Sequence, residues 1–493
     1  MIYNFNLGIG WASSGVEYAQ IYRARMFRNI GVDTKFVFTD MFPSENMEHM
    51  TKNIGFLDSE VIWLYTFFTD FKTAPVTYSL SDLEKTFTDL NYTKTREGKI
   101  CRYVFGGSNN FYTAYMVNDH DDFVHRVEMV SNGFLIRKDY FTYGRVYSEY
   151  YAPLDNKAHL YHRRFFNENG SVAYEEIIDD DRVMYKFKDK ILCSKEEFVG
   201  YMVSQLNLTS DDAVLIDRST DIGQSIIMNC KPARVGTVVH ADHFSEKETN
   251  EDYILWNNFY EYEFNMHKHI DFYICSTQAQ SDLMVQQFEK YYGVTPCVYT
   301  IPVGSLPELK YPKENRKPFS LITASRLASE KHVDWICKAV IQARSEVPEL
   351  SLDIYGEGGE KSKLETIIRD NNASSYIHLM GQHDLSEVYQ NYEAYIAGST
   401  SEGFGLTLME AVGGGLPIIG FDVRYGNPTF IRNGENGYLI NLPEEDKDRI
   451  EALRKGIVDL FKQDLEKCHS VSYEVAKDFL TSNVQEKWRE AVC

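Results

Sequence analysis

SLITASRLASEKHVDWICKAVIQARSEVPELSLDIYG, residues 320–356, has the pattern of an apolar strand, an amphipathic helix and a second apolar strand. The same alternation continues to residue 422. The further predicted elements are the helix EKSKLETIIRDN (360–371), the strand IHLMG (377–381), the helix LSEVYQNYE (385–393), the strand AYIAGS (394–399), the helix GLTLMEAVGGG (405–415) and the strand PIIGFD (417–422). Strands that alternate with helices at this spacing predict a parallel, doubly wound sheet.

A second domain of the same class is predicted at the N-terminus. The strand IYNFNLGIG (2–10) precedes the helix VEYAQIYRARMFRNIG (16–31) and the strand KFVFTD (35–40). Ser14-Gly-Val-Glu17 is a capping-box arrangement at the start of that helix. The alternation of strands and helices resumes near residue 205, with the apolar strands AVLIDRS (213–219), RVGTVVH (234–240) and DFYICST (271–277).

The interrupting segment, from about residue 70 to 200, has a different pattern. Short runs of alternating apolar and aromatic residues, such as RYVF (102–105) and VAYEEII (172–178), are separated by turn-rich stretches. These stretches are FGGSNN (105–110), VNDHDD (117–122), SNG (131–133), PLDNK (153–157), NENGS (167–171) and DDDR (179–182). Such spacing predicts antiparallel hairpins, and therefore an inserted β-domain whose aromatic residues lie mainly in its core.

The predicted architecture is α/β, with two doubly wound Rossmann-like domains that face a cleft. The predicted parts are an N-terminal Rossmann-like domain (1–70 and 200–305), an inserted β-rich domain that docks an acceptor or partner (71–199), a C-terminal Rossmann-like domain (306–475) and a C-terminal helix that packs back on the first domain (476–493). The cleft between the facing strand ends is the expected ligand site.

The composition of the chain indicates which binding partners and which cellular compartment are compatible with the protein. The 493 residues include 51 Lys and Arg and 72 Asp and Glu, a formal net charge of −21, which disfavours nucleic acid and anionic lipid as partners. The eight scattered cysteines, without a CxxC pair, fit a reducing cytoplasm. The start MIYNFNLGIGW lacks the features of a secretory signal, and no run approaches the roughly 20 apolar residues of a membrane span.

The segment EGFGLTLME, residues 402–410, has a glutamate at each end of a run that begins Gly-Phe-Gly. In a continuous helix Glu402 and Glu410 would lie about 12 Å apart, which is too far for both to act on one bond. If the glycines keep the first half as a loop, Glu402 approaches the helix N-terminus while Glu410 stays on the helix. The two glutamates would then contact different parts of one elongated ligand.

A helix that begins near Gly405 would offer that ligand an anion-binding end. The amides of Leu406 and Thr407 and the positive end of the helix dipole favour phosphate. Arg326 and Lys331, directly after a predicted strand, add the positive charge that an acidic chain otherwise lacks.

Gln382 and His383 follow another predicted strand and are expected to open onto the same cleft. Glu410, about one and a half turns into its helix, could accept both hydroxyls of a ribose. Glu402, before the glycines, is left for the group beyond the phosphates. The segment therefore predicts a site for a nucleotide diphosphate with a further group attached.

Metal binding is the weaker interpretation of three other motifs. Asp119-His-Asp121 and Asp179-Asp-Asp181 resemble metal-binding triplets, but they fall in predicted hairpin turns, where solvated acidic residues are common. His240-Ala-Asp-His243 has two imidazoles at a strand end, which more often form structural or substrate hydrogen bonds. We predict no metal ligand.

Arg326 and Lys331 followed by Glu402-x7-Glu410 resemble the signature of retaining GT-B glycosyltransferases of family 4, which use nucleotide-activated sugars. Several longer stretches resemble one branch of that family, the catalytic subunits of the accessory Sec glycosyltransferase pair. These stretches are IYNFNLGIGWASSGVEYAQ (2–20), VVHADHFSE (238–246), NEDYILWNN (250–258), RKPFSLITASRL (316–327) and TSEGFGLTLMEA (400–411). The resemblance covers essentially the full length and implies that the C-terminal Rossmann-like domain binds a nucleotide sugar.

The resemblance also implies a role for individual positions, with Glu402, His240, Arg326 and Lys331 as the catalytic set. It places Gly15, Val16, Glu17 and Tyr18 against the nucleotide phosphates, Gln382 and His383 by the base and ribose, and Glu410 on the ribose. It places His240, Glu402, Gly403, Phe404 and Gly405 on the donor sugar, and Leu406, Thr407, Arg326 and Lys331 on the diphosphate. The family implies a reaction without metal, in which an acceptor hydroxyl attacks from the side of the leaving UDP and a phosphate oxygen takes its proton.

Three functions stay open at this point. The first is transfer of GlcNAc from UDP-GlcNAc to Ser or Thr of a serine-rich repeat adhesin, which implies a cytoplasmic enzyme, a homologous non-catalytic stabilising subunit and at most peripheral membrane association through that subunit. The second is an α-glucosyltransferase that uses UDP-glucose and acts on poly(glycerol phosphate) teichoic acid. A basic face on the insertion would favour this polyanionic acceptor. The third is a non-catalytic glycan-binding partner, which would be expected to lose Arg326, Lys331, Glu402 and Glu410, yet all four are present.

Overall fold

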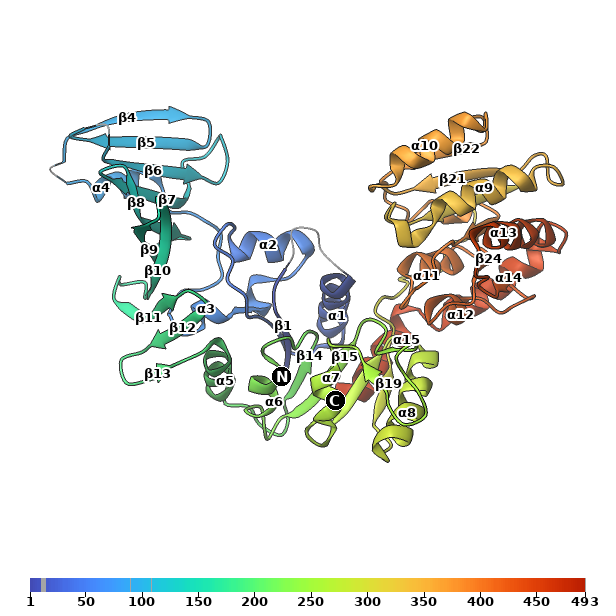
Figure 1. Ribbon diagram of the computed structural model, residues 1–493, viewed down its shortest axis with the longest axis horizontal. Coiled ribbons are helices and arrows are strands. Elements are labelled where there is room, and N and C mark those ends of the chain that lie inside the picture. Colours follow the sequence, from blue (N-terminus) through green and yellow to red (C-terminus); the bar gives the residue numbers. More distant parts are fainter. Residues whose placement is uncertain (10–14, 89, 108, 493) are drawn as a thin grey trace. The chain divides into compact units, whose positions relative to one another are not determined.

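The computed structural model describes residues 1–9, 15–88, 90–107 and 109–492 of the chain. The described chain divides into two compact units, one formed by residues 1–24, 31–237 and 258–271 and the other by residues 25–30, 238–257 and 272–493. Within this described part, two parallel sheets and one long antiparallel sheet organise the fold (Figure 1). This arrangement confirms the predicted α/β class and the insertion of an antiparallel β-domain into the first α/β domain.

The first parallel sheet has the strand order β19-β18-β15-β14-β1-β2-β3. Its strands are β1 (Ile2–Asn6), β2 (Thr34–Phe38), β3 (Val61–Trp63), β14 (Ala213–Ile216), β15 (Arg234–Val239), β18 (Phe272–Cys275) and β19 (Val298–Thr300). Strand β14 is buried along its whole length, as expected of a parallel strand that is covered on both faces. The helices that occur between these strands along the chain, outside the insertion, are α1 (Gly15–Ile30), α2 (Met47–Ile54), α3 (Leu64–Phe67), α5 (Lys195–Gln205), α6 (Gly223–Ile227), α7 (Glu261–Asn265) and α8 (Gln278–Tyr292).

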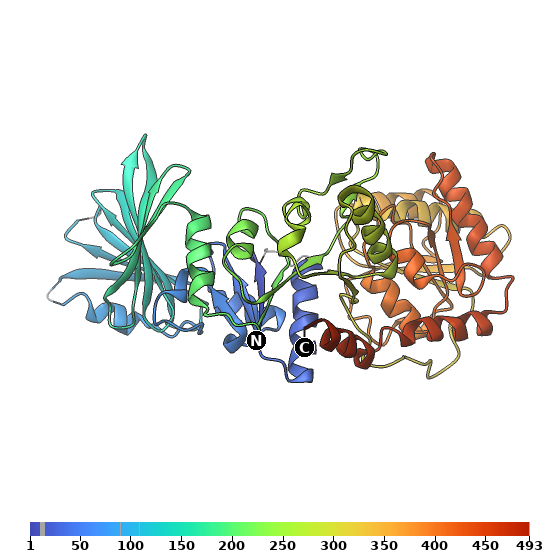
Figure 2. The same ribbon diagram turned by 90° about the horizontal axis from the view of Figure 1, so that it is seen from below.

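The insertion is a ten-stranded antiparallel sheet whose strands β4 to β13 lie in chain order. The strands are β4 (Tyr92–Glu97), β5 (Ile100–Phe105), β6 (Phe111–Met116), β7 (Val124–Ser131), β8 (Phe134–Phe141), β9 (Arg145–Leu154), β10 (Lys157–Phe166), β11 (Val172–Asp179), β12 (Arg182–Lys186) and β13 (Ile191–Leu192). The described residues of the predicted turn stretches lie at junctions of consecutive strands, where Asn132, Asp155 and Asn156 adopt positive φ. Ser108, in the stretch 105–110, lies outside the described residues. The sheet is strongly twisted (blue to teal in Figure 2), and helix α4 (Leu80–Lys85) packs on its core.

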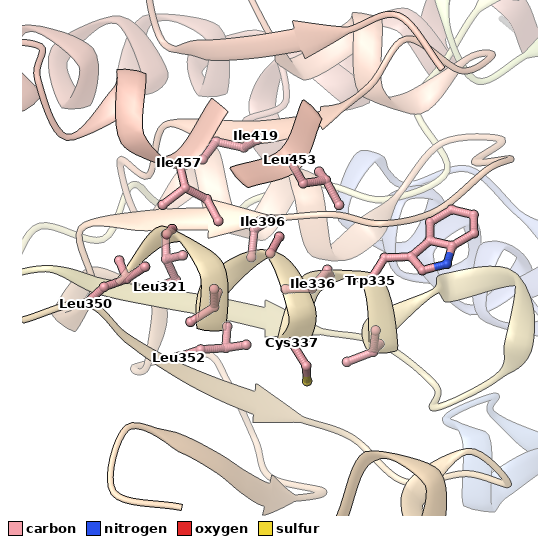
Figure 3. Packing of buried hydrophobic residues seen from close by; sticks show 14 of the residues in the cluster. Leu321, Trp335, Ile336, Cys337, Leu350, Leu352, Ile396, Ile419, Leu453 and Ile457 are labelled. Carbon is pink, nitrogen blue, oxygen red and sulfur yellow. The ribbon is translucent and has the colours of Figure 1, made fainter. Parts of the chain in front are cut away.

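The second parallel sheet has the order β22-β21-β20-β23-β24-β25. Its strands are β20 (Ser320–Ala324), β21 (Ser351–Tyr355), β22 (Ile377–Gly381), β23 (Ala394–Ile396), β24 (Ile418–Phe421) and β25 (Gly437–Ile440). Successive strand residues face opposite layers. Figure 3 shows Leu321 among residues of helices α9 (Val333–Ala343) and α13 (Asp446–Leu460). The same cluster includes residues of α10 (Lys361–Asp370). Ile322 packs on the other side, with α11 (Leu406–Gly413), α12 (Gly426–Phe430) and α14 (Leu465–Lys477). The carboxyl ends of these strands therefore lead into the loops that were predicted to bind the ligand.

Two features near the ends of this sheet complete the fold. The helix predicted over 385–393 is wrong, because the structure has only the 3-10 turn η4 (Tyr389–Asn391) there. Tyr392 donates a hydrogen bond to Asp353 on β21, and this tertiary contact replaces the regular helix that the apolar spacing favours. The last helix, α15 (Thr481–Val492), places the Trp488 ring edge-on against Phe27 of α1, with ring centroids 5.2 Å apart.

Candidate active site

The segment Glu402–Gly405, here named the EGFG loop, is a loop and not the start of a helix, as predicted. Gly405 has φ +88°, and a Cβ atom at this position would lie 2.6 Å from Leu408 Cδ1, so a larger residue does not fit. Helix α11 begins at Leu406. The amides of Leu406 and Thr407 therefore belong to the first turn, whose N–H groups have no partner within a helix. This end of α11 is suited to binding a phosphate.

Lys331 and Glu402 are brought together by loops that lie far apart in the sequence. Lys331 ends the 3-10 turn η3 (Ser329–Lys331) after β20, and its Nζ lies 2.7 Å from Glu402 Oε2. The two side chains are only 19% and 20% exposed, so the pair is shielded from solvent more than a surface pair. The structure therefore pairs Lys331, which is predicted to bind the diphosphate, with Glu402, which is predicted to bind the sugar.

Arg326 pairs with a different residue. Its side chain is 80% exposed and its Nη2 lies 3.3 Å from Glu330 Oε1. Arg326 borders a pocket of about 310 Å³ that is lined by residues 326–329 and 357–360. An exposed guanidinium beside an open pocket remains available to an anionic ligand.

The segment GEGG (356–359) follows β21, its Gly358 and Gly359 line the same pocket, and its glycines were not predicted. A Cβ atom at Gly356 would lie 1.9 Å from the Ser325 carbonyl oxygen, and one at Gly358 would lie 2.4 Å from that of Leu327. Both glycines also have positive φ. They therefore let the loop after β21 pack directly on the backbone that carries Arg326. A Gly-x-Gly pair at a strand end was the available sequence signal.

Glu410 lies on α11, is half-buried and accepts a hydrogen bond from Tyr389 Oη at 3.0 Å. Burial raises the pKa of Glu410, and the Tyr389 hydrogen bond opposes that rise. Tyr389 approaches this closely because Gly414, at the end of α11, has no side chain: a Cβ atom there would lie 2.8 Å from Tyr389 Cβ. Tyr389 was missed in the sequence because the segment was interpreted as an ordinary helix.

Thr407 and the loop after β22 have defined contacts. Tyr395 Oη lies 3.1 Å from the Thr407 hydroxyl oxygen, and this hydrogen bond ties the first turn of α11 to strand β23. Gln382 and His383 are exposed, as expected of ligand-facing residues, and His383 Nε2 lies 2.8 Å from the Met380 carbonyl oxygen. The His383 ring also meets the edge of Tyr355, at 5.9 Å between ring centroids.

The loop that carries His240 is firmly anchored. Gln280 Nε2 donates to the Ala241 carbonyl at 2.8 Å, and Asn257 Nδ2 donates to the Asp242 carbonyl at the same distance. The His240 carbonyl oxygen lies 3.4 Å from the position that a Cβ atom on Gly403 would occupy. The predicted sugar contacts His240 and Gly403 are thus neighbours.

Other predicted contacts belong to the first turn of α1 or to the protein core. Gly15 and Tyr18 are exposed and Val16 is half-exposed, whereas Glu17 is 1% exposed and accepts from Arg218 Nη1 at 3.3 Å. The predicted capping residue Ser14 lies outside the described residues. Phe404 is 6% exposed and packs in the hydrophobic core beside Phe430 and Phe479, so its side chain supports the EGFG loop from behind.

The acidic triplets of the insertion have ordinary turn contacts. The Asn118 side-chain oxygen accepts a hydrogen bond from the Asp121 backbone amide, and its Nδ2 donates one to the Asp121 carboxylate, both at 2.8 Å. Arg182 Nη2 lies 2.8 Å from the Asp179 carboxylate. No group of three His, Cys, Asp or Glu side chains is placed to hold a metal in the described part of the chain. Over the same residues, no helix combines the length and the apolar character needed to cross a membrane.

Two protein families match this chain. The family described as GtfA extended beta-sheet domain matches residues 93–189, within the antiparallel sheet. The family described as glycosyl transferases group 1 matches residues 308–478, which contain the second parallel sheet.

Full-length relatives agree with these matches. The UDP-N-acetylglucosamine–peptide N-acetylglucosaminyltransferase GtfA subunit of Streptococcus agalactiae is 52% identical, over 99% of this chain and 97% of the relative. The subunit of the same name from Streptococcus pneumoniae is 50% identical, over 100% of this chain and 98% of the relative.

Solved structures extend the comparison to the fold. The crystal structure of the pneumococcal O-GlcNAc transferase GtfA in complex with UDP and GlcNAc is 49% identical, with a TM-score of 0.87 over 100% of this chain and 98% of that chain. A chain of a GtfA/B complex is 51% identical, with a TM-score of 0.96 over the same shares. TarM, only 18% identical, shares the fold with a TM-score of 0.68 over 100% of this chain and 98% of that chain. These matches confirm the GT-B fold that the sequence resemblance implies, and the chain belongs to the GtfA family of glycosyltransferase subunits.

Proposed function

We propose that this chain transfers N-acetylglucosamine from UDP-N-acetylglucosamine to serine and threonine hydroxyls of a peptide, with retention at the anomeric carbon. The observation that carries this proposal is the Lys331–Glu402 pair beside the N-terminus of α11, in a chain half-identical to relatives named for this transfer. A cation, a helix end and a carboxylate in one place suit the junction between a diphosphate and its sugar.

Each group of residues has a distinct part in the proposed reaction. The amides of Leu406 and Thr407, together with Arg326 and Lys331, bind the diphosphate. The bond between the anomeric carbon and the UDP oxygen breaks as the acceptor oxygen bonds to that carbon, and a phosphate oxygen takes the acceptor proton. Negative charge therefore grows on the diphosphate, where fixed positive groups stabilise it without a divalent cation.

Glu402 and His240 would hold the donor sugar, and Glu410 would accept the ribose hydroxyls, with Gln382 and His383 near the base. The position of Glu402 beside Lys331 supports this assignment, because the sugar is attached to the phosphate that Lys331 would bind. Glu410, farther along α11, is held by Tyr389 and so presents a fixed carboxylate. Gly15 to Tyr18 would contribute phosphate contacts from the first turn of α1.

We further propose a serine-rich repeat adhesin as the acceptor and a homologous non-catalytic subunit as the partner. The match of the insertion to a dedicated sheet family, and the existence of a GtfA/B complex for a relative, support a docking role for this sheet. The proposed compartment is the cytoplasm, with membrane association only through the partner. The free cysteines, among them the exposed Cys193 and Cys297, fit a reducing environment.

The test is mass spectrometry of acceptors after incubation with the chain and its partner. A serine-rich peptide and a poly(glycerol phosphate) oligomer would each be offered UDP-GlcNAc and UDP-glucose. We expect an added N-acetylhexosamine on the peptide alone. Glucose on the glycerol phosphate chain would instead support a teichoic acid glucosyltransferase, which the net charge of −21 disfavours because the acceptor is a polyanion.

A further inference from the structure

The backbone of Glu402 is held by the segment Arg424–Gly426. Its carbonyl oxygen accepts hydrogen bonds from the amides of Tyr425 and Gly426, at 2.6 and 2.7 Å, and its own amide donates to the Arg424 carbonyl at 3.2 Å. Gly426 makes this approach possible, because a Cβ atom there would lie 2.3 Å from the Phe404 carbonyl oxygen. The position of Glu402 therefore depends on where residues 424–426 lie.

The side chain of Tyr425 is in turn fixed by His243. Tyr425 is 1% exposed, and its hydroxyl lies 3.3 Å from Nδ1 of His243, which is fully buried. The other ring nitrogen, Nε2, lies 2.7 Å from Gln287 Oε1 on α8. Because that amide oxygen accepts only, Nε2 carries the proton and Nδ1 is the acceptor for the Tyr425 hydroxyl. Burial lowers the pKa of His243 to about 4, so the ring is neutral and keeps this tautomer at ordinary pH.

The same histidine belongs to the anchored loop that carries His240. The His243 carbonyl accepts the Asn257 amide at 2.9 Å, and the His240 carbonyl lies against Gly403. The His243–Tyr425 contact thus connects the two loops that would hold the donor sugar.

We propose that His243 and Tyr425 are positioning residues for Glu402: they hold the EGFG loop against the His240 loop, so that the Glu402 carboxylate meets the donor sugar beside Lys331. This inference rests on the proposed function and adds to it the residues that set sugar orientation. Both side chains are buried, so we expect them to act through Glu402 without touching the ligand.

The test compares Tyr425→Phe, His243→Phe and the double variant in the full-length chain. UDP affinity should stay within about twofold of wild type, while turnover of UDP-GlcNAc falls on the order of 10- to 100-fold, because a slight displacement of a reacting group has that effect. Discrimination between UDP-GlcNAc and UDP-glucose should fall as well. The double variant should be no worse than the worse single variant, since all three lose one shared contact.

The matched control is Tyr291→Phe. Tyr291 also lies on α8, and its hydroxyl donates to the Asn250 carbonyl at 2.6 Å, so this variant loses a tyrosine hydrogen bond from the same helix that involves neither His243 nor Tyr425. It should retain wild-type turnover. Variants that lose thermal stability and UDP affinity together, with unchanged turnover at saturating donor, would show a merely structural contact and overturn the inference. Wild-type protein that turns over no UDP-sugar would instead overturn the proposed function, and this inference with it.

Discussion

Lys331 Nζ lies 2.7 Å from Glu402 Oε2. The residue predicted to bind the diphosphate and the residue predicted to bind the sugar therefore neutralise each other's charge in the structure without a donor. In the proposed function, an incoming diphosphate would compete with Glu402 for the ammonium group. Because both side chains are largely shielded, this competition would take place where charges interact more strongly than in bulk water. Donor binding would then free the Glu402 carboxylate to accept hydrogen bonds from the sugar that arrives with the phosphates.

Glu402→Gln should leave UDP affinity unchanged or slightly tighter, because the variant removes a carboxylate that competes for Lys331. Turnover should nevertheless fall by roughly 10²–10³-fold, the scale of losing one stabilising contact in the transition state. Calorimetric titration with UDP and initial rates with UDP-GlcNAc measure the two effects separately. A loss of UDP affinity as large as that of Glu410→Gln would contradict the placement of Glu402 at the sugar.

Lys331→Ala and Arg326→Ala should each slow transfer by roughly 10²–10³-fold. Their effects on folding should differ: Arg326 is 80% exposed and its loss should not change the melting temperature. Loss of Lys331 leaves Glu402 partly buried without its partner and should lower that temperature slightly. Arg369→Ala, which removes an arginine that is 71% exposed on α10, is the control and should keep the wild-type rate. Near-normal rates in both site variants would place the diphosphate elsewhere.

UDP affinity should fall at acidic pH because protonated Glu410 no longer accepts from both ribose hydroxyls. Burial raises the pKa of Glu410, so the loss should begin above the pH at which an ordinary glutamate protonates. Tyr389→Phe removes a hydrogen bond that favours the ionised form, and the midpoint of the loss should move to still higher pH. UDP titrations across a pH series measure this midpoint.

Glu410→Gln is the control for that series. The variant should bind UDP more weakly at neutral pH, because a charge-assisted hydrogen bond contributes about 1.5–3 kcal/mol. Because glutamine does not titrate, the loss of UDP affinity at acidic pH that we assign to Glu410 should be absent in this variant. If Tyr389→Phe moved the midpoint to lower pH, the assigned role of the Tyr389 hydroxyl would be wrong.

The sequence predicts the fold well because its signals are local and repeated. The alternation of strands and helices after residue 320 and the turn stretches of the insertion specify each element through its own residues, and both sheets follow. The predicted helix over 385–393 failed for the opposite reason. Tyr392 donates a hydrogen bond to Asp353, and Tyr389 donates one to Glu410. These contacts with residues distant in the sequence override the local pattern.

The candidate site is predictable only in part, for a similar reason. Glu402, Lys331 and the helix N-terminus have recognisable residue types at recognisable spacing. Tyr425 and His243 do not, because their importance lies in a contact between residues 182 positions apart. A tyrosine and a histidine in such a sequence are indistinguishable from ordinary core residues until the chain is folded.

Activity should persist in excess chelator. The proposed diphosphate site uses the amides at the start of α11, Arg326 and Lys331, and these groups supply the positive charge that many transferases obtain from a divalent ion. Turnover of UDP-GlcNAc would be measured before and after dialysis against EDTA, with and without added manganese. Activity that is lost in EDTA and restored by manganese would show that these groups are insufficient.

The exposed face of the insertion should be needed for the acceptor or partner and not for the donor. Deleting the sheet is an unsuitable test, because Tyr65 and Trp63 of the first α/β domain pack against Phe165 and Tyr147 of the sheet, with ring centroids 5.7 and 6.3 Å apart. The loss of that seam would expose core aromatic residues and unfold the domain. Point variants on the outer face avoid this problem.

Ile177 and Met184 form a cross-strand pair between β11 and β12 and are 40% and 37% exposed, so lysine at both positions is compatible with the fold. Ile177→Lys with Met184→Lys should reduce transfer to a serine-rich peptide, measured with the partner subunit present, by roughly tenfold or more, since central contacts dominate interface energetics. UDP affinity and donor hydrolysis should stay at wild-type values, because the insertion carries none of the proposed donor contacts. Leu57→Lys, which adds charge at a residue that is 51% exposed on the first α/β domain, is the control. Unchanged peptide transfer in the double variant would show that this face does not dock the acceptor or the partner, and a parallel loss of UDP binding would contradict the separation of donor and acceptor sites.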